Sequence, residues 1–328
     1  MFADETLPGA AVPSLWRSAR SSRCEAALCL HTLSYPAAQE QLLQVTGVSW
    51  NATGSVVACS YGRMNDGDWG TEKSYVCTWN LDRRRLDPQR PDLVVDAASS
   101  VMCLAFHPSQ PSLIAGGLFS GEVVVWDTSK AEDPLVWRTG MTDDTHTDPV
   151  YQVLWLPEAE HGNHIQLLSA STDGKILRWR EERAGRLAVA EGFALVAQQI
   201  PRSARMKKVH LSSVLQTQPL ISLQLSTKYL FCVRWSPVRP LVFAVASGEG
   251  EVQLFDLEKS SQKPAVRMKQ AADQCPVYCL EFNSKQARLL AAGDAAGALK
   301  VWQLSSDFTE QGLRETKRLE QLASELPD

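Results

Sequence analysis

The run VMCLAFHPSQPSLIAGGLFSGEVVVWD, residues 101–127, decides the fold of this chain. It opens with alternating apolar residues that end at Phe106, and Pro108 stops this segment two residues later. Small residues follow at 113–117, then a glycine at 121 and a second alternating segment that ends at Trp126. Alternation with period two is typical of strands, and glycine supplies the positive φ of a tight turn. The run therefore predicts three antiparallel strands.

The same unit occurs five times, which indicates a repeat protein. The first strand of each unit ends in an aromatic residue: Trp50, Phe106, Trp155, Trp235 and Phe282. The third strand ends in a second aromatic residue: Trp79, Trp126, Trp179, Phe255 and Trp302. In four units a turn glycine stands five residues before this second aromatic: Gly121, Gly174, Gly250 and Gly297. Such units bury both faces only by stacking, so we predict an all-β propeller with five readable blades, in which the ten aromatic residues plug the core.

The outer strands and the spacing of the units define the limits of the propeller. Outer strands are expected at 135–139, 193–200 and 265–269, and residues 24–35 are placed to supply the outer strand of the last blade. The interval from Trp179 to Trp235 is twice as long as the equivalent interval in other units, such as that from Trp126 to Trp155. This interval holds two successive outer-strand candidates, 193–200 and 219–226, as an excision of whole blades would leave. We place the join near 207–217 and expect residues 201–218 to lack strand pairing.

On this basis we divide the chain into a flexible segment at 1–23, a propeller at 24–309 and a helical tail at 310–328 with apolar residues at helical spacing. Hydrophobic residues make up 44% of the 328 residues and the formal net charge is −4, which argues against an obligate duplex-DNA binder. No apolar run approaches the length that a membrane span needs, and the acidic start lacks the pattern of a secretory signal. The eight cysteines form no CxxC pair, so reduced core thiols in an intracellular protein are expected.

No catalytic motif is recognisable, and we predict neither an enzyme nor a cofactor or metal site. Two unusual loops, 63–73 and 140–149, join strands at the same end of their blades, so they would share one face. They carry five aspartates, Trp69 and a histidine: Asp66, Asp68, Asp143, Asp144, Asp148 and His146. Two interpretations stay open: ordinary solvated loops with a structural His146, or an acidic partner-binding face with an aromatic anchor. The basic run at 83–85 is expected to be a solvated surface, with phosphate or RNA contact as the alternative.

Several longer stretches carry a resemblance to a known family. They are GSVVACSYGRMNDGDWGTEKSYVCTWNLDRR (54–84), LAFHPSQPSLIAGGLFSGEVVVWD (104–127), WRTGMTDDTHTDPV (137–150), LFCVRWSPVRPLVFAVASGEGEVQLFDLEKSSQKP (230–264) and AAGDAAGALKVWQLSSDFTEQG (291–312). Together they resemble the WD-repeat intermediate chains of dynein motors, most closely those of cytoplasmic dynein-2. The resemblance extends from about residue 28 to residue 312, broken around 207–217.

The resemblance implies a non-catalytic motor subunit that binds the dynein-2 heavy-chain tail and works beside the other dynein-2 intermediate chain. Its expected setting is retrograde intraflagellar transport, in the cytoplasm, at the centrosome and ciliary base, and along the axoneme. The family has seven blades and an N-terminal extension that recruits dynein light chains. Only a short segment precedes the first strand here, which makes light-chain binding doubtful. The alternative function is a generic WD-repeat adaptor, such as a ubiquitin-ligase substrate receptor.

Overall fold

A computed structural model describes residues 26–64, 73–130, 132–157, 165–194, 208–211, 221–271 and 275–324. Most strands form five antiparallel four-stranded blades, which we name A to E. Blade A contains β2 (Gln44–Trp50), β3 (Val56–Gly62), β4 (Ser74–Asn80) and β5 (Leu93–Ala97). Blade B contains β6 (Val101–Phe106), β7 (Leu113–Leu118), β8 (Val123–Asp127) and β9 (Leu135–Arg138). Blade C contains β10 (Val150–Pro157), β11 (Ile165–Ser171), β12 (Lys175–Glu182) and β13 (Arg186–Ala194).

The last two blades follow a separate hairpin. This hairpin pairs β14 (Lys208–Leu211) with β15 (Ile221–Gln224). Blade D contains β16 (Leu230–Trp235), β17 (Val242–Ser247), β18 (Glu251–Asp256) and β19 (Val266–Lys269). Blade E contains β20 (Val277–Phe282), β21 (Leu289–Asp294), β22 (Leu299–Leu304) and, as its outer strand, β1 (Ala27–Leu33). The prediction that residues 24–35 complete the last blade is confirmed, because β1 pairs antiparallel with β22.

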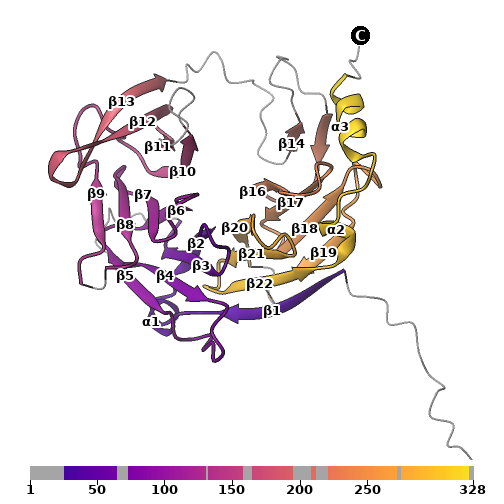
Figure 1. Cartoon of the computed structure of the whole chain (residues 1–328), viewed down its shortest axis with the longest axis horizontal. Helices are drawn as coiled ribbons and strands as arrows, with labels where there is room; N and C mark the ends of the chain where they lie inside the picture. The colour runs from indigo at the N-terminus through magenta and orange to yellow at the C-terminus, as the bar shows by residue number, and fades with distance from the viewer. Residues whose placement is uncertain are drawn as a thin grey trace, which may run out of the picture.

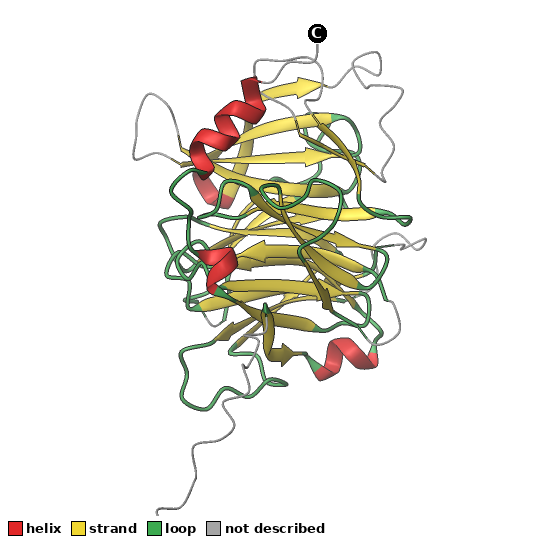
Figure 2. Ribbon diagram, turned by 90° about the vertical axis from the view of Figure 1, so that its right-hand side faces the viewer, coloured by secondary structure: helices red, strands yellow, loops and turns green. Residues whose placement is uncertain are grey.

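The blades stand side by side around an arc. Their inner strands contact one another in the order β10, β6, β2, β20 and β16, and β10 and β16 end the series (Figure 1). Figure 2 shows the sheets from the side, with α1 (Pro36–Glu40), α2 (Ser306–Thr309) and α3 (Glu315–Ser324) at the periphery. The single backbone pair between Arg186 and Arg138 joins the outer strands of blades C and B. The arrangement is a propeller of five blades, as the repeats predict.

The small residues of each second strand make room for the aromatic residues. A Cβ atom on Gly116 would lie 2.5 Å from the ring of Trp126, so the glycine lets the indole lie flat on the strand. Eight predicted plugs are at most 8% exposed: Trp50, Trp79, Phe106, Trp126, Trp179, Phe255, Phe282 and Trp302. Trp155 is half-buried and donates its indole N–H to the Ala105 carbonyl at 2.9 Å. The four turn glycines have φ between 78° and 90°, a region that favours glycine.

Three expectations were wrong. Trp235 is 44% exposed rather than a core plug, because no further blade among the described residues packs on that side of blade D. The outer strand of blade C is β13 at 186–194 rather than 193–200, because a turn through Ala184 (φ 62°) and Gly185 (φ 71°) leads β12 directly back on itself. Residues 208–211 are paired with 221–224, within the stretch expected to lack strand pairing.

The C-terminal helix α3 docks on blade D through a buried ion pair. Glu315 at its first turn is 2% exposed and accepts a hydrogen bond from Nε of Arg239 at 2.6 Å. Arg239 is itself 5% exposed and also contacts Asp256 at 3.2 Å. The tail beyond residue 310 is therefore attached to the propeller by a specific contact. The expected flexible segment at 1–23 lies outside the described residues.

Candidate functional site

A hollow with an exposed apolar lining lies on the loop face of blades B and C. It has a volume of about 980 Å³ and is lined by residues of four loops: 98–99, 119–122, 141–149 and Thr172. Two of these loops lead from one blade to the next, and two join the second and third strands within a blade. Both kinds of connection emerge at the same end of the strands, which brings the four loops together. We call this hollow the loop-face groove.

Loop 140–149 is held in place by its own threonines. The backbone N–H of Thr142 donates to Oγ1 of Thr145 at 3.0 Å, and this hydroxyl donates back to the Thr142 carbonyl at 2.8 Å. Thr145 is 4% exposed, whereas its neighbours Asp143 and Asp144 are exposed. Gly140 begins the loop at a φ of 69°. The loop therefore presents its acidic residues on a fixed backbone.

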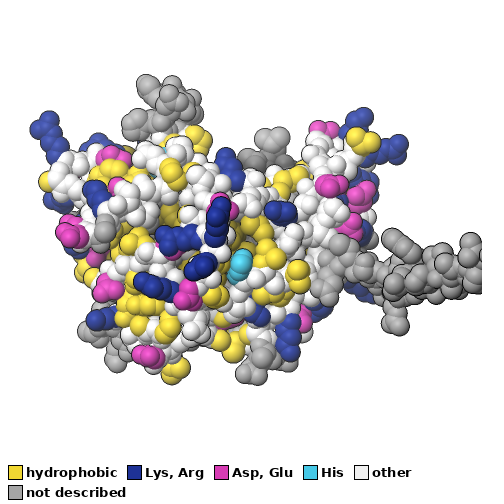
Figure 3. All heavy atoms as spheres, turned by 60° about the horizontal axis from the view of Figure 1, so that its bottom comes forward, with side chains coloured by type: hydrophobic (Ala, Val, Ile, Leu, Met, Phe, Trp, Pro, Cys, Tyr) yellow, Lys and Arg dark blue, Asp and Glu magenta, His cyan; other side chains and the backbone are white. Residues whose placement is uncertain are grey.

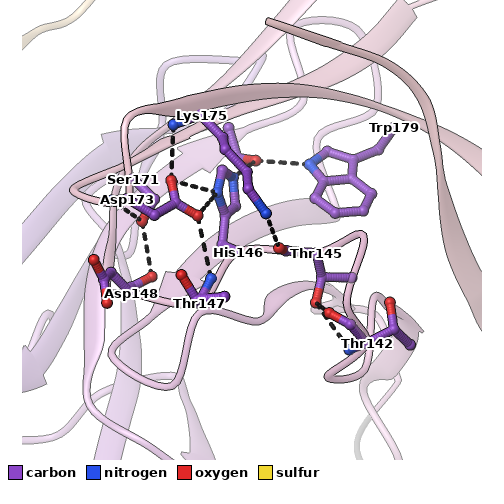
Figure 4. Close-up of polar contacts among 10 residues, drawn as sticks. Thr142, Thr145, His146, Thr147, Asp148, Ser171, Asp173, Lys175 and Trp179 are labelled. Carbon is purple, nitrogen blue, oxygen red and sulfur yellow. Dashed lines mark hydrogen bonds and ion pairs between the residues drawn. The ribbon is translucent and has the colours of Figure 1, made fainter. Parts of the chain in front are cut away.

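A buried polar chain supports the loop from below (Figure 4). His146 Nδ1 lies 3.1 Å from the Asp173 carboxylate, and Nε2 lies 2.7 Å from Oγ of Ser169. The same Ser169 hydroxyl accepts the indole N–H of Trp179 at 2.7 Å. Since the carboxylate only accepts, Nδ1 carries the proton, and Nε2 accepts from the Ser169 hydroxyl. These hydrogen bonds link the loop to two strands of blade C and to the core tryptophan of that blade.

The surroundings of His146 favour the neutral form of its imidazole. Burial lowers the pKa of His146 from its ordinary value, and the nearby carboxylate of Asp173 only partly opposes that effect. Burial alone would raise the pKa of Asp173, but backbone N–H groups of Lys175 and Thr147 and the His146 ring outweigh it, so the pKa is lowered. Lys175 also donates to the Thr145 carbonyl at 3.0 Å. The groups form a rigid support without a catalytic nucleophile.

The sequence-predicted face residues divide into three groups. Asp143 and Asp148 are exposed and line the loop-face groove, and Asp144 is exposed next to Asp143 in the same loop. The His146 side chain is 3% exposed with both ring nitrogens engaged, which fits the structural role that one of the two interpretations gave it and does not fit a surface contact. Three further residues lie outside the described part of the chain: Asp66, Asp68 and Trp69. Only the acidic rim of loop 140–149 is therefore placed by the structure.

Sequence reasoning missed the apolar part of the groove. Met141 is 71% exposed, and Phe119 and Pro149 are half-buried beside it. A methionine standing alone in a polar loop was the one signal that could have pointed to it. The groove thus combines an apolar surface with an acidic rim formed by Asp143 and Asp148, and Asp144 is exposed beside this rim.

A smaller, basic hollow lies in the loop that connects the third and fourth strands of blade A. Its volume is about 390 Å³, and its lining includes Arg83, Arg85 and Arg90. Figure 3 shows the face that lies at the bottom of Figure 1, with several Lys and Arg side chains near the centre of the view. Arg83 is paired with Asp92 at 2.6 Å, and Asp87 also lines the hollow. The lining is thus of mixed charge, which makes it the weaker candidate.

The described residues contain neither a candidate metal site nor a helix that could span a membrane. No group of three or more His, Cys, Asp or Glu residues there could hold a metal ion. No helix among the same residues is long and apolar enough to cross a membrane. The seven cysteines that the structure describes are free thiols, and burial raises the pKa of Cys59 and of Cys103 to about 12. These thiols are packing residues rather than nucleophiles.

The stacked blades and the His–Asp–Ser–Trp chain beneath a blade-connecting loop define a WD-repeat β-propeller. A family model described as the dynein axonemal intermediate chain 3 WD40 domain matches residues 69–172, a segment that contains every loop of the groove. Cytoplasmic dynein 2 intermediate chain 2 of Mus musculus is 54% identical, over 91% of this chain and 72% of the mouse protein. The Homo sapiens protein of the same name is 52% identical with the same coverage.

A more distant relative, the cytoplasmic dynein 1 intermediate chain of Drosophila melanogaster, is 21% identical over 94% of this chain and 55% of its own length. The chain belongs to the family of dynein intermediate chains, in the group of cytoplasmic dynein 2 intermediate chain 2. It is therefore a non-catalytic WD-repeat subunit.

Proposed function

We propose that this propeller binds the heavy-chain tail of dynein-2 through the loop-face groove and serves retrograde intraflagellar transport. The observation that carries the proposal is the combination of an apolar surface with an acidic rim. Met141 offers a long flexible side chain at 71% exposure, and the exposed Asp143 and Asp144 follow it in the same loop. Apolar anchors supply most of the affinity of such contacts, and charges mainly steer the encounter and exclude wrong partners. A basic amphipathic segment is the partner that fits.

The proposal places the chain beside the other dynein-2 intermediate chain, in the cytoplasm and in the cilium. The names of its relatives support this setting, because both mouse and human proteins are named as intermediate chains of cytoplasmic dynein 2. The groove loops also lie wholly within the residues that the family model matches. A partner surface shared by the family would be expected in such a segment.

Charge reversal of the rim tests the proposal. The double variant Asp143→Lys/Asp144→Lys should capture the dynein-2 heavy-chain tail at least about tenfold less well, with a flatter salt dependence. The control is Glu132→Lys/Asp133→Lys, which reverses two exposed acidic residues at the opposite end of blade B. Both double variants should keep the wild-type melting temperature. Equal capture by the two double variants at low and high salt would refute the role of the groove, and recovery of ligase components instead of heavy chain would favour a generic adaptor.

A further inference from the structure

The arc of blades ends in an exposed apolar face on blade C. The register aligns Leu154 with Leu168, and Leu156 with Gln166, on the side of the sheet that faces away from blade B. Leu154 is 46% exposed and Leu156 38% exposed. On the opposite side of the same strand Val153 is 1% exposed against blade B. One face of blade C is therefore packed as a blade interface, and the other is left open.

A recurring contact between inner strands is also missing at this edge. Every inner strand has a register shift near its start, and in three blades the residue after the shift is a cysteine. Each of these thiols points to a carbonyl of the next inner strand: Cys103 to Val150, Cys232 to Leu280 and Cys279 to Val45. The equivalent residue of blade C is Gln152, whose amide donates to Val153 of its own strand at 3.4 Å. Among the described residues, β10 has no following inner strand to contact.

Blade D shows the complementary free face. Trp235 is 44% exposed on this side, and the fully buried Phe243 lies beside it, 5.4 Å between ring centroids. Leu223, in the hairpin, and Leu225, just after it, cover the outer part of this face. Gln253 is 1% exposed here, and neither polar atom of its amide has a partner in the described structure. Buried amide groups in folded proteins normally have hydrogen-bond partners, so the partners of this amide are missing from the described structure.

The comparison with the mouse relative gives the number of positions that this chain lacks. The alignment spans 387 positions, whereas 91% of this 328-residue chain is about 298 residues. The difference, 387 less 298, leaves about 89 positions occupied by the relative alone. One blade here repeats from Val101 to Val150, so the missing positions exceed one such repeat and fall short of two. We assign these positions to the interval between β13 and β16, where the spacing of the repeats is interrupted and β14 pairs only with β15.

We propose that the gap between blade C and the β14–β15 hairpin binds a WD-type β-sheet module supplied by a second polypeptide. The module packs an apolar sheet face on Leu154 and Leu156, and sets an inner strand beside β10. Its other edge completes the half-blade of the hairpin and covers Trp235.

The experiment uses the full chain together with the segment of the mouse relative that has no counterpart here. The two polypeptides are co-expressed, and only the segment is tagged. We expect one-to-one capture of the chain, with new protection of the β10 and β16 amides from hydrogen exchange. Leu154→Asp and Trp235→Asp should each reduce capture about tenfold or more, because a carboxylate would be desolvated in the contact. Leu28→Asp is the matched control, since Leu28 is 50% exposed on β1 at the outer edge of blade E.

Three results would overturn the proposal. The first is the absence of capture on co-expression. The second is capture that Leu154→Asp and Trp235→Asp reduce no more than Leu28→Asp does. The third is concentration-dependent dimerisation of the chain alone that the two gap variants abolish, because this would assign the faces to a second copy. None of these results bears on the loop-face groove, so the proposed function is tested separately.

Discussion

Replacement of His146 by alanine probes the support of the loop-face groove. The imidazole is 3% exposed and bonded on both sides, to Asp173 at 3.1 Å and to Ser169 at 2.7 Å. A hydrogen bond to a charged group contributes about 1.5–3 kcal/mol and a neutral one about 0.5–1.5 kcal/mol. The two bonds together predict a loss of about 2–4.5 kcal/mol in the free energy of unfolding, before any cavity cost. This is a large share of the roughly 5–15 kcal/mol typical of a folded protein.

Urea unfolding followed by tryptophan fluorescence at pH 7.5 measures this loss. The pH dependence provides a second readout, with its sign set by the lowered pKa of His146. The unfolded chain then binds more protons, so the contribution of His146 to stability is complete above about pH 6.5 and falls as the pH drops through the folded pKa. His146→Gln should remove this part of the acid sensitivity. A loss below about 1 kcal/mol for His146→Ala, or the same acid sensitivity in His146→Gln, would refute the reasoning.

Three further substitutions test the packing. At Gly121 the φ is 90° and an added Cβ atom would lie 2.5 Å from a backbone oxygen, whereas at Gly140 the φ is 69° and the space is open. Gly121→Ala should therefore lower the melting temperature more than Gly140→Ala does. Burial raises the pKa of Glu281 to about 7, so its contribution is complete below about pH 4.5 and is lost as the pH rises through 7; Glu281→Gln should be the more stable form at pH 8 in urea unfolding. Arg239→Met leaves Glu315 buried without its cation, and should cost about 3–5 kcal/mol in the same assay.

Much of the fold could be predicted because each blade repeats a local pattern. The aromatic residue at the end of a third strand, such as Trp126, needs small residues on the neighbouring strand and a turn glycine before it, and all three signals lie within a single repeat unit. The closure of blade E by β1 also followed from order along the chain. The outer strand of blade C was misplaced because its position depends on the turn at Gly185, which no repeat position marks.

The remaining errors arise because the burial of a side chain depends on which neighbouring blades and loops pack on it, and a repeat pattern does not give these neighbours. Trp235 occupies the same repeat position as the buried Phe282, yet only the latter has a neighbouring blade on both sides. Topology led us to expect an acidic face shared by loops 63–73 and 140–149, but only the exposed aspartates of loop 140–149 lie within the described residues. The apolar part of the groove could not be predicted, since the exposure of Met141 depends on how loop 140–149 is fixed by its threonines.

The most direct test of the central claim is hydrogen exchange of the full chain with and without the dynein-2 heavy-chain tail. We predict new protection in the groove loops, at 98–99, 119–122 and 141–149, where the tail would cover exposed backbone. The loops at the opposite end of the same blades, such as 128–134, should exchange unchanged. Protection confined to those opposite loops, or to none of the described residues, would contradict the assignment of the groove as the heavy-chain site.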